Sequence, residues 1–194
     1  MALPHGCLNA DFIIGGSYKY TRGGPGACWL AIHPRHLDRH QPELVTLDTG
    51  WIARREPFAF ARGVTERAGD GNAWMESTPM VLSVYQARAG LELTLAIGVE
   101  RLREYNLRQQ AFLIRQLQAV GVHVREIHPR GAFVLIPTDD VKRDVARIAG
   151  QKVVTDGRPG ASGRGGHVRL CPDLLTTEAE MVQAAQRIAH ALRP

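Results

Sequence analysis

Short apolar runs near the start of the chain predict strands. The run DFIIGG at residues 11–16 is bounded by polar and glycine residues, as a buried strand of an α/β sheet often is. A second run, ACWLAIH at residues 27–33, follows a turn rich in glycine and proline at residues 23–26. Two strands are therefore expected to flank the segment that contains Lys19.

Beyond the second strand, the hydrophobic pattern loses its periodicity over residues 33–72. This stretch is rich in proline, arginine and glycine, so we expect irregular loops with isolated anchors such as Trp51, Phe58 and Phe60. A loop of this length in a compact protein is usually functional or stabilised by a partner.

Apolar positions at helical spacing occupy the middle of the chain. Ser77 or Thr78 is expected to cap the first helix, with Pro79 in its first turn. The apolar stripe predicts one helix over residues 78–90 and a longer one over residues 92–119.

The last part of the chain alternates between strand and helix patterns. Strands are expected at residues 122–127, 132–136, 153–155 and 167–170. A helix with Thr138 as its cap is expected over residues 139–149, and a closing helix over residues 176–192, where Thr177 and Glu180 can form a capping box.

This alternation places the chain in the α/β class. Residues 1–95 are expected to form part of a larger domain, and residues 96–194 a linking helix and a small α/β domain. With 194 residues, 44% of them hydrophobic, the chain can bury a core of ordinary size. No run approaches the roughly 20 apolar residues of a membrane span, and the start lacks a signal-peptide pattern, so we expect a soluble, cytoplasmic protein with no membrane partner.

The net charge of +5 is compatible with an anionic partner, but the arginines are spread along the chain among acidic residues, which does not favour nucleic acid. The cysteines are scattered and odd in number, at Cys7, Cys28 and Cys171. Their placement argues against a disulfide framework and against a zinc site built from paired thiolates.

Lys19 is one of three lysines in the chain. It follows a predicted strand, lies between Tyr18 and Tyr20, and precedes a glycine-rich turn. A lysine in such a setting can act as an amine nucleophile, for instance as a Schiff base with an aldehyde cofactor, and the tyrosine hydroxyls can bind a phosphate. A strand-end lysine that merely extends to solvent fits the same pattern.

Short motifs occur in a fixed order along the chain: SYKY at 17–20 followed by GGPG at 23–26, DTGW at 48–51, ESTP at 76–79 and VRLCP at 168–172. Together they resemble segments of the class V aminotransferase family, in particular its kynureninase-like branch. The resemblance spans essentially the whole chain. It implies the carboxyl-terminal part of a fold type I pyridoxal-phosphate enzyme: the end of the large mixed-sheet domain and a small α/β domain.

The resemblance implies roles for five residues. Lys19 would form the Schiff base with pyridoxal 5'-phosphate and move protons at Cα of the substrate. Tyr18 would bind the cofactor phosphate, as would Trp51 and Thr78 from the neighbouring subunit of a dimer. Arg169 would hold the substrate α-carboxylate, for which its planar fork is suited.

Two other patterns are weaker. His33, His36 and His40 have spacings near those of metal ligands, but no carboxylate or thiolate accompanies them, so we expect no metal site. The glycine-rich loop at residues 157–166 lacks the ending of a phosphate-binding P-loop, and we expect it to be a connection that helps to place Arg169.

Part of the family's cofactor site lies further upstream of the lysine than this chain extends: the first phosphate loop, the aromatic residue that stacks on the ring, and the aspartate at the ring nitrogen. Asp11 lies too close to Lys19 to be that aspartate. We therefore expect the isolated chain to be a weak or inactive enzyme. It is a portion of a longer enzyme, one half of a two-part assembly, or a relict with another role.

Two classes of function follow. The first is a pyridoxal-phosphate enzyme that hydrolyses kynurenine or a related β-keto amino acid, acting as a homodimer or paired with a missing amino-terminal half; another class V aminotransferase or lyase is the nearest alternative. The second is a non-catalytic dimerisation or interaction module that keeps the fold.

Overall fold

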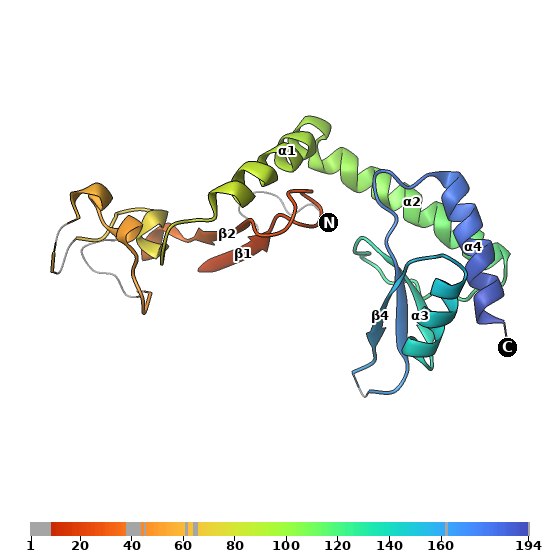
Figure 1. The fold of residues 1–194 in the computed structure, drawn as a ribbon. Helices are drawn as coiled ribbons and strands as arrows, with labels where there is room; N and C mark the ends of the chain where they lie inside the picture. Colours follow the sequence, from red (N-terminus) through yellow and green to blue (C-terminus); the bar gives the residue numbers. More distant parts are fainter. Residues whose placement is uncertain are drawn as a thin grey trace. The chain divides into compact units, whose positions relative to one another are not determined.

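The computed structural model describes residues 9–37, 44, 46–60, 62–63, 66–161 and 163–193. The chain divides into two compact units, a first unit of Leu3–Ile97 and a second of Gly98–Pro194 with Met1–Ala2. Figure 1 shows their helices and strands coloured along the chain. The content of mixed helices and small sheets confirms the α/β class.

The first unit contains a two-stranded antiparallel sheet of β1 (Phe12–Gly16) and β2 (Cys28–Ile32), in which Phe12 pairs with Ile32. Both predicted strands are confirmed. The burial predicted for the first strand is wrong at Ile14 of β1, which is 82% exposed.

The segment between β2 and the next helix is irregular, as predicted. Its described residues include four short 3₁₀ turns: η1 (Pro34–His36), η2 (Trp51–Ala53), η3 (Pro57–Ala59) and η4 (Gly71–Trp74). Buried Ala53 and Ala73 anchor it.

Two helices fill the middle of the chain: α1 (Val81–Ile97) closes the first unit and α2 (Val99–Ala119) opens the second. The predicted break near residue 91 is wrong. It lies at Gly98, whose φ of 92° is a left-handed conformation that glycine adopts without strain. The first helix also begins three residues later than predicted.

The second unit contains a three-stranded antiparallel sheet with β5 at its centre. Its strands are β3 (Val134–Thr138), β4 (Asp156–Pro159) and β5 (Gly166–Leu170), in the order β3-β5-β4. The helices α2, α3 (Val141–Gly150) and α4 (Glu178–Leu192) contribute to its core. The largest fully buried apolar side chains of this core are Leu117, Ile148, Val168 and Ile188.

Local differences from the predicted elements have physical reasons. Residues 122–127 form no strand: Val122 and Val124 enter the core, but only Arg125 pairs with the sheet, in a single bridge to Leu135. The strand expected at residues 153–155 begins at Asp156 instead.

The helix caps were predicted with mixed success. Asp140, not Thr138, caps α3, since its side chain accepts a hydrogen bond from the backbone N–H of Arg143. The predicted capping box of α4 is confirmed: Thr177 and Glu180 bond each other's backbone. Over the described ranges, we find no helix long and apolar enough to cross a membrane.

Candidate functional site

The loop between β1 and β2 carries Lys19 and is closed at its base by Ser17. The Ser17 N–H donates to the Ala27 carbonyl (2.9 Å), and the Ser17 carbonyl accepts from the Gly23 N–H (2.6 Å) and from Thr21 Oγ1 (3.0 Å). Ser17 is itself buried, with 4% of its surface exposed. These hydrogen bonds hold the two ends of the lysine loop together.

Lys19 lies at the exposed end of this loop. Its carbonyl accepts a hydrogen bond from the Arg22 N–H (3.0 Å), and its Nζ lies 5.4 Å from the centre of the Tyr18 ring. Tyr18 is exposed as well. The structure thus brings Tyr18 and Lys19 together and leaves a primary amine accessible for reaction with an aldehyde.

Trp51 and Thr78 are brought together from segments far apart in sequence. Trp51 Nε1 donates a hydrogen bond to Thr78 Oγ1 (3.0 Å). The approach depends on Gly50, whose N–H donates to the Met75 carbonyl (3.2 Å) and where an added Cβ would lie 2.5 Å from the carbonyl carbon of Glu76. Glycine before the tryptophan therefore lets these two backbone segments touch.

The anchors expected to be isolated form one aromatic cluster instead. Phe58 lies edge-on to the Trp51 ring, with centres 5.3 Å apart, and Phe60 stacks at 6.3 Å. Phe58 and Phe60 remain 75% and 72% exposed. The cluster presents aromatic surface beside the Trp51–Thr78 hydrogen bond.

Arg169 lies in the second unit, on β5. Its guanidinium forms an ion pair with Asp156 of β4, its partner in the strand register, and lies 5.1 Å from the centre of the Phe133 ring. The hydrogen bond from Arg169 holds the pKa of the Asp156 carboxyl below its usual value. Arg169 Nε is buried and has no hydrogen-bond partner.

Sequence reasoning missed Asp156 and Phe133 as neighbours of Arg169. Nothing in the linear spacing points to them, because the contacts depend on how β5 pairs with β4, which carries Asp156, and with β3, which follows Phe133 directly. The strand register of Asp156 opposite Arg169 is the signal that identifies the pair.

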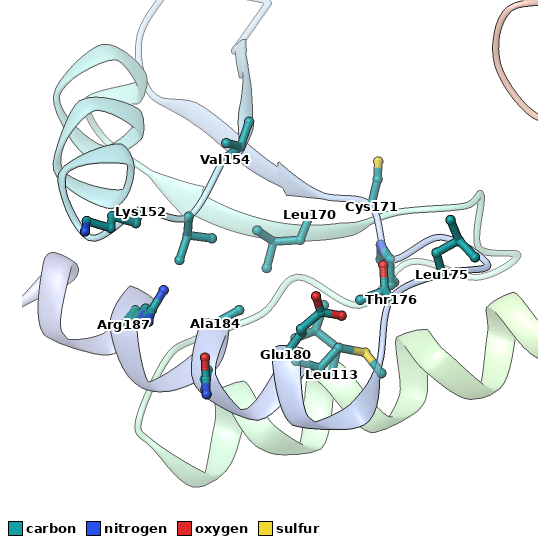
Figure 2. Close-up of a pocket in the computed structure, with 14 residues that line it drawn as sticks. Leu113, Lys152, Val154, Leu170, Cys171, Leu175, Thr176, Glu180, Ala184 and Arg187 are labelled. Atoms are coloured by element: carbon teal, nitrogen blue, oxygen red, sulfur yellow. The ribbon is translucent and has the colours of Figure 1, made fainter.

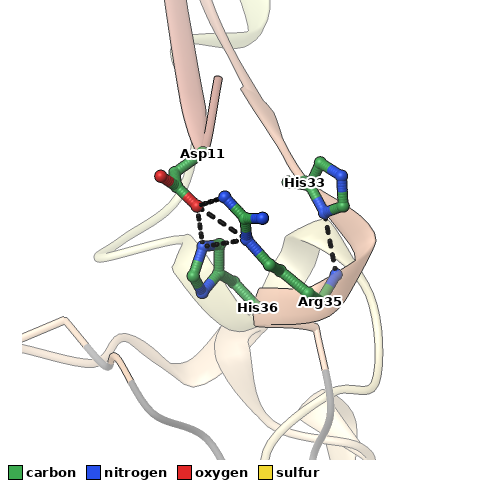
Figure 3. Close-up of polar contacts among 4 residues, drawn as sticks. All are labelled: Asp11, His33, Arg35 and His36. Atoms are coloured by element: carbon green, nitrogen blue, oxygen red, sulfur yellow. Dashed lines mark hydrogen bonds and ion pairs between the residues drawn. The ribbon is translucent and has the colours of Figure 1, made fainter. Parts of the chain in front are cut away.

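Asp11 holds the far end of the β1–β2 hairpin (Figure 3). Its Oδ1 accepts a hydrogen bond from Arg35 Nε (2.7 Å) and lies 2.6 Å from His36 Nε2. These hydrogen bonds, that of His36 first and then that of Arg35, lower the pKa of Asp11 from 3.8 to about 2. Asp11 is therefore a carboxylate with a structural partner on η1.

His33 and His36 make contacts that stabilise η1 and the end of the hairpin. His33 Nδ1 accepts from the Arg35 N–H (3.2 Å) and caps η1, while the His36 ring stacks on Phe12 with centres 5.1 Å apart. His40 lies outside the described residues. Of the side chains with described positions, none form a group of three or more His, Cys, Asp or Glu that could hold a metal ion.

The second unit has a pocket of about 590 Å³ between α4, the end of β5 and the segment after α3. Figure 2 shows Lys152 and Arg187 at one end of it, and Cys171 and Leu175 at the other. Arg169 does not line this pocket. The pocket is therefore distinct from Arg169, where the family resemblance places the substrate carboxylate.

Comparison with known proteins gives a consistent set of relatives. The chain is 35% identical to the kynureninase of Deinococcus radiodurans over 121 residues, which cover 62% of the chain and 28% of that protein. It is 31% identical to the Bacillus anthracis kynureninase, covering 70% of the chain and 29% of that protein. It is 33% identical to a Bacillus cereus kynureninase over 190 residues, covering 93% of the chain and 42% of that protein. No family model matches.

Solved structures show a similar fold. Two structures of SPT with PLP, one of them with the PLP internal aldimine, superimpose with TM-scores of 0.58 and 0.54 at 13% and 15% sequence identity. Each match covers 93% of this chain and 39% of the solved chain. At this level of identity, the likeness concerns the fold.

The fold is that of the fold type I pyridoxal-phosphate enzymes, and the chain contains part of it. Within this class the sequence is kynureninase-like, which confirms the resemblance carried by its motifs. The chain spans less than half the length of each of these three kynureninases.

Proposed function

We propose that the chain is the lysine-bearing, carboxyl-terminal part of a pyridoxal-phosphate enzyme that hydrolyses kynurenine or a related β-keto amino acid. The similarity to a kynureninase over 93% of the chain supports this proposal. The observation that carries it is the closed loop on which Lys19 presents an accessible amine beside the Tyr18 ring.

The residues present suit both the aldehyde and the phosphate group of pyridoxal 5'-phosphate. The Lys19 amine can form a Schiff base with the cofactor aldehyde. At the phosphate end, a hydroxyl can accept one hydrogen bond and donate another, so Thr78 Oγ1 can accept from Trp51 and donate to a phosphate oxygen. Tyr18 offers a second hydroxyl. We propose that Trp51 and Thr78 serve the site of the neighbouring subunit in a homodimer.

Asp11 does not fit the role of the aspartate at the ring nitrogen. Its carboxylate is bound to Arg35 and lies against His36, both on η1. We therefore propose that this aspartate, the stacking aromatic residue and the first phosphate loop come from the part of the relatives that this chain does not span. The chain alone is then weak or inactive.

The proposed chemistry assigns a task to each side chain. When bound, pyridoxal phosphate supplies the electron sink for the substrate Cα. Lys19 holds the cofactor and, once displaced by the substrate amine, moves the proton at Cα. Arg169 holds the α-carboxylate. Hydrolysis adds water across the bond between the side-chain ketone and Cβ, releasing an aromatic acid and alanine.

The exposed aromatic cluster favours a second candidate, a non-catalytic dimerisation or interaction module. Phe58 and Phe60 offer apolar surface that a partner chain can cover. Transamination or lyase chemistry on another amino acid is the nearest catalytic alternative. A cytoplasmic location stays a prediction from the sequence.

Reductive trapping tests the proposal. The full chain is mixed with pyridoxal phosphate, reduced with borohydride and mapped by peptide mass spectrometry, with Lys142 and Lys152 as internal references and Lys19→Ala as the control. Labelling at Lys19 above both references supports the proposal. Equal labelling of all three lysines contradicts cofactor binding by the chain and favours the interaction module.

A further inference from the structure

Helix α1 packs directly on the loop that carries Lys19. Its buried positions are all small residues, spaced about one helical turn apart: Ser83, Ala87, Gly90 and Thr94. Large apolar side chains of the same helix, such as Leu82 and Leu95, are exposed. The side of α1 that meets the loop is therefore the side without bulky side chains.

Gly90 marks the closest approach. A Cβ added to Gly90 would lie 2.5 Å from the Thr21 carbonyl oxygen and closer still to the carbonyl of Arg22. Both contacts are with backbone atoms, which cannot rotate away as the end of a long side chain can. Any residue larger than glycine must therefore displace either the loop or the helix.

The contact continues along the preceding turns of α1. A Cβ on Gly23 would lie 2.9 Å from the Ala87 Cβ, and one on Gly26 would lie 2.6 Å from Ser83 Oγ. Glycines of the loop thus face small residues of the helix at two further points. The helix and the loop therefore pack closely, with no large side chain between their backbones at these points.

The backbone that Gly90 contacts is hydrogen-bonded to the backbone of Lys19. The Arg22 N–H donates to the Lys19 carbonyl (3.0 Å), and the next N–H, that of Gly23, donates to the Ser17 carbonyl (2.6 Å). A shift of Arg22 would strain the first hydrogen bond and tilt the turn that presents the amine. Glycine inside a helix is less favourable than alanine, so its use at this position requires such a compensating gain.

We propose that Gly90 is a positioning residue for Lys19. Its lack of a side chain allows α1 to seat the backbone of Thr21 and Arg22, which fixes the direction of the Lys19 side chain. The inference rests on the proposed function, because Schiff-base chemistry requires an amine in a fixed orientation. The packing itself can be tested without cofactor.

The first experiment measures hydrogen exchange in the full chain. In Gly90→Ala, the amides of Arg22 and Gly23 should exchange about tenfold faster, because their hydrogen bonds open more readily. Gly150→Ala is the control, since a Cβ there meets no atom within 4 Å. Unchanged exchange at both loop amides in Gly90→Ala overturns the proposal.

A second pair of variants covers the case in which Gly90→Ala unfolds the first unit. Ala87→Gly removes the methyl group that faces Gly23, without adding bulk, and Ala89→Gly makes the same change at an exposed position of α1. Ala87→Gly should accelerate exchange at Gly23 more than Ala89→Gly does. Equal effects would show a general loss of helix stability and overturn the proposal.

The readout at the lysine is its labelling by formaldehyde and cyanoborohydride as a function of pH. In Gly90→Ala the pH profile of Lys19 should change relative to those of Lys142 and Lys152, whereas in Gly150→Ala it should stay as in the wild type. If the loop amides exchange faster but the pH profile of Lys19 labelling is unchanged, Gly90 has a structural role only, and the proposal is overturned. Failure of pyridoxal phosphate to label wild-type Lys19 overturns cofactor binding by the chain and leaves the exchange result standing.

Discussion

Asp156 and Arg169 face each other across β4 and β5, and their side chains form an ion pair. The arginine that the family resemblance assigns to the substrate carboxylate thus already holds a carboxylate of its own chain. With 24% of its side chain exposed, Arg169 is partly accessible. A substrate carboxylate must share the guanidinium with Asp156 or displace it.

Asp156→Asn is expected to strengthen binding of a small amino acid at Arg169. The amide competes less well than a carboxylate for a guanidinium, so alanine should bind at least about threefold more tightly. An NMR titration of the full chain with alanine measures this. Asp139→Asn, an exposed carboxylate of the same unit, controls for the change in net charge. Equal affinities in the two variants would show that Asp156 does not compete.

Thr78→Val should disturb Trp51, and Thr78→Ser should not. Valine removes the hydroxyl that accepts the Trp51 Nε1 hydrogen bond, whereas serine keeps it. Water can reach the partly exposed indole, so the loss of stability should stay below about 1 kcal/mol. The indole N–H resonance of Trp51 is the measurement, and a shift of equal size in both variants would mean that the hydroxyl makes no such bond in solution.

Sequence and structure agree where the signal is local. A turn rich in glycine and proline separates β1 from β2, and the capping box of α4 depends only on Thr177 and Glu180. Each of these signals needs only a few neighbouring residues. They could therefore be predicted without knowledge of the rest of the fold.

The helix break shows where local signals become ambiguous. Two glycines, Gly90 and Gly98, interrupt the same apolar stripe, and the pattern suggested a break beside the first. Gly90 lies inside α1, where its lack of a side chain allows the close contact with the lysine loop, while Gly98 adopts the left-handed conformation at which the helix ends. Only the tertiary contact distinguishes the two.

The candidate site shows the same limit. The position of Lys19 after a predicted strand and before a glycine-rich turn marked it as unusual. Nothing in the spacing of Trp51 and Thr78 predicts their hydrogen bond, and the resemblance alone linked them. Asp156 was missed because its proximity to Arg169 depends on strand register. The single bridge at Arg125 shows the same limit. Alternating apolar positions indicate which side chains enter a core, but not whether the segment pairs with a neighbouring strand.

Leu117→Ala should destabilise the second unit by about 2–5 kcal/mol, because it leaves a cavity in a core that has no solvent access there. Leu107→Ala, on a more exposed position of α2, should cost about 1 kcal/mol or less. Urea unfolding followed through the amide signals of β5 measures both. Similar costs for the two variants would place Leu117 outside the core.

Acid should weaken the end of the hairpin that Asp11 holds. The pKa of Asp11 is lowered from 3.8 to about 2, chiefly by its hydrogen bonds with His36 and Arg35. A carboxyl with a lowered pKa stabilises the fold above its unfolded value and loses this contribution as the pH falls through the folded value. The stability that Asp11 supplies is therefore complete above about pH 4 and lost by about pH 2.

The variant Asp11→Asn isolates this contribution from the other carboxyl groups. It should destabilise the first unit at pH 6, and the difference from the wild type should shrink as the pH approaches 2. All three tryptophans, Trp29, Trp51 and Trp74, lie in the first unit, so tryptophan fluorescence during urea unfolding reports on that unit. Asp48→Asn, at an exposed position of the same unit, controls for the change in net charge. A gap between Asp11→Asn and the wild type that stays constant with pH would mean that the Asp11 pair does not survive in solution.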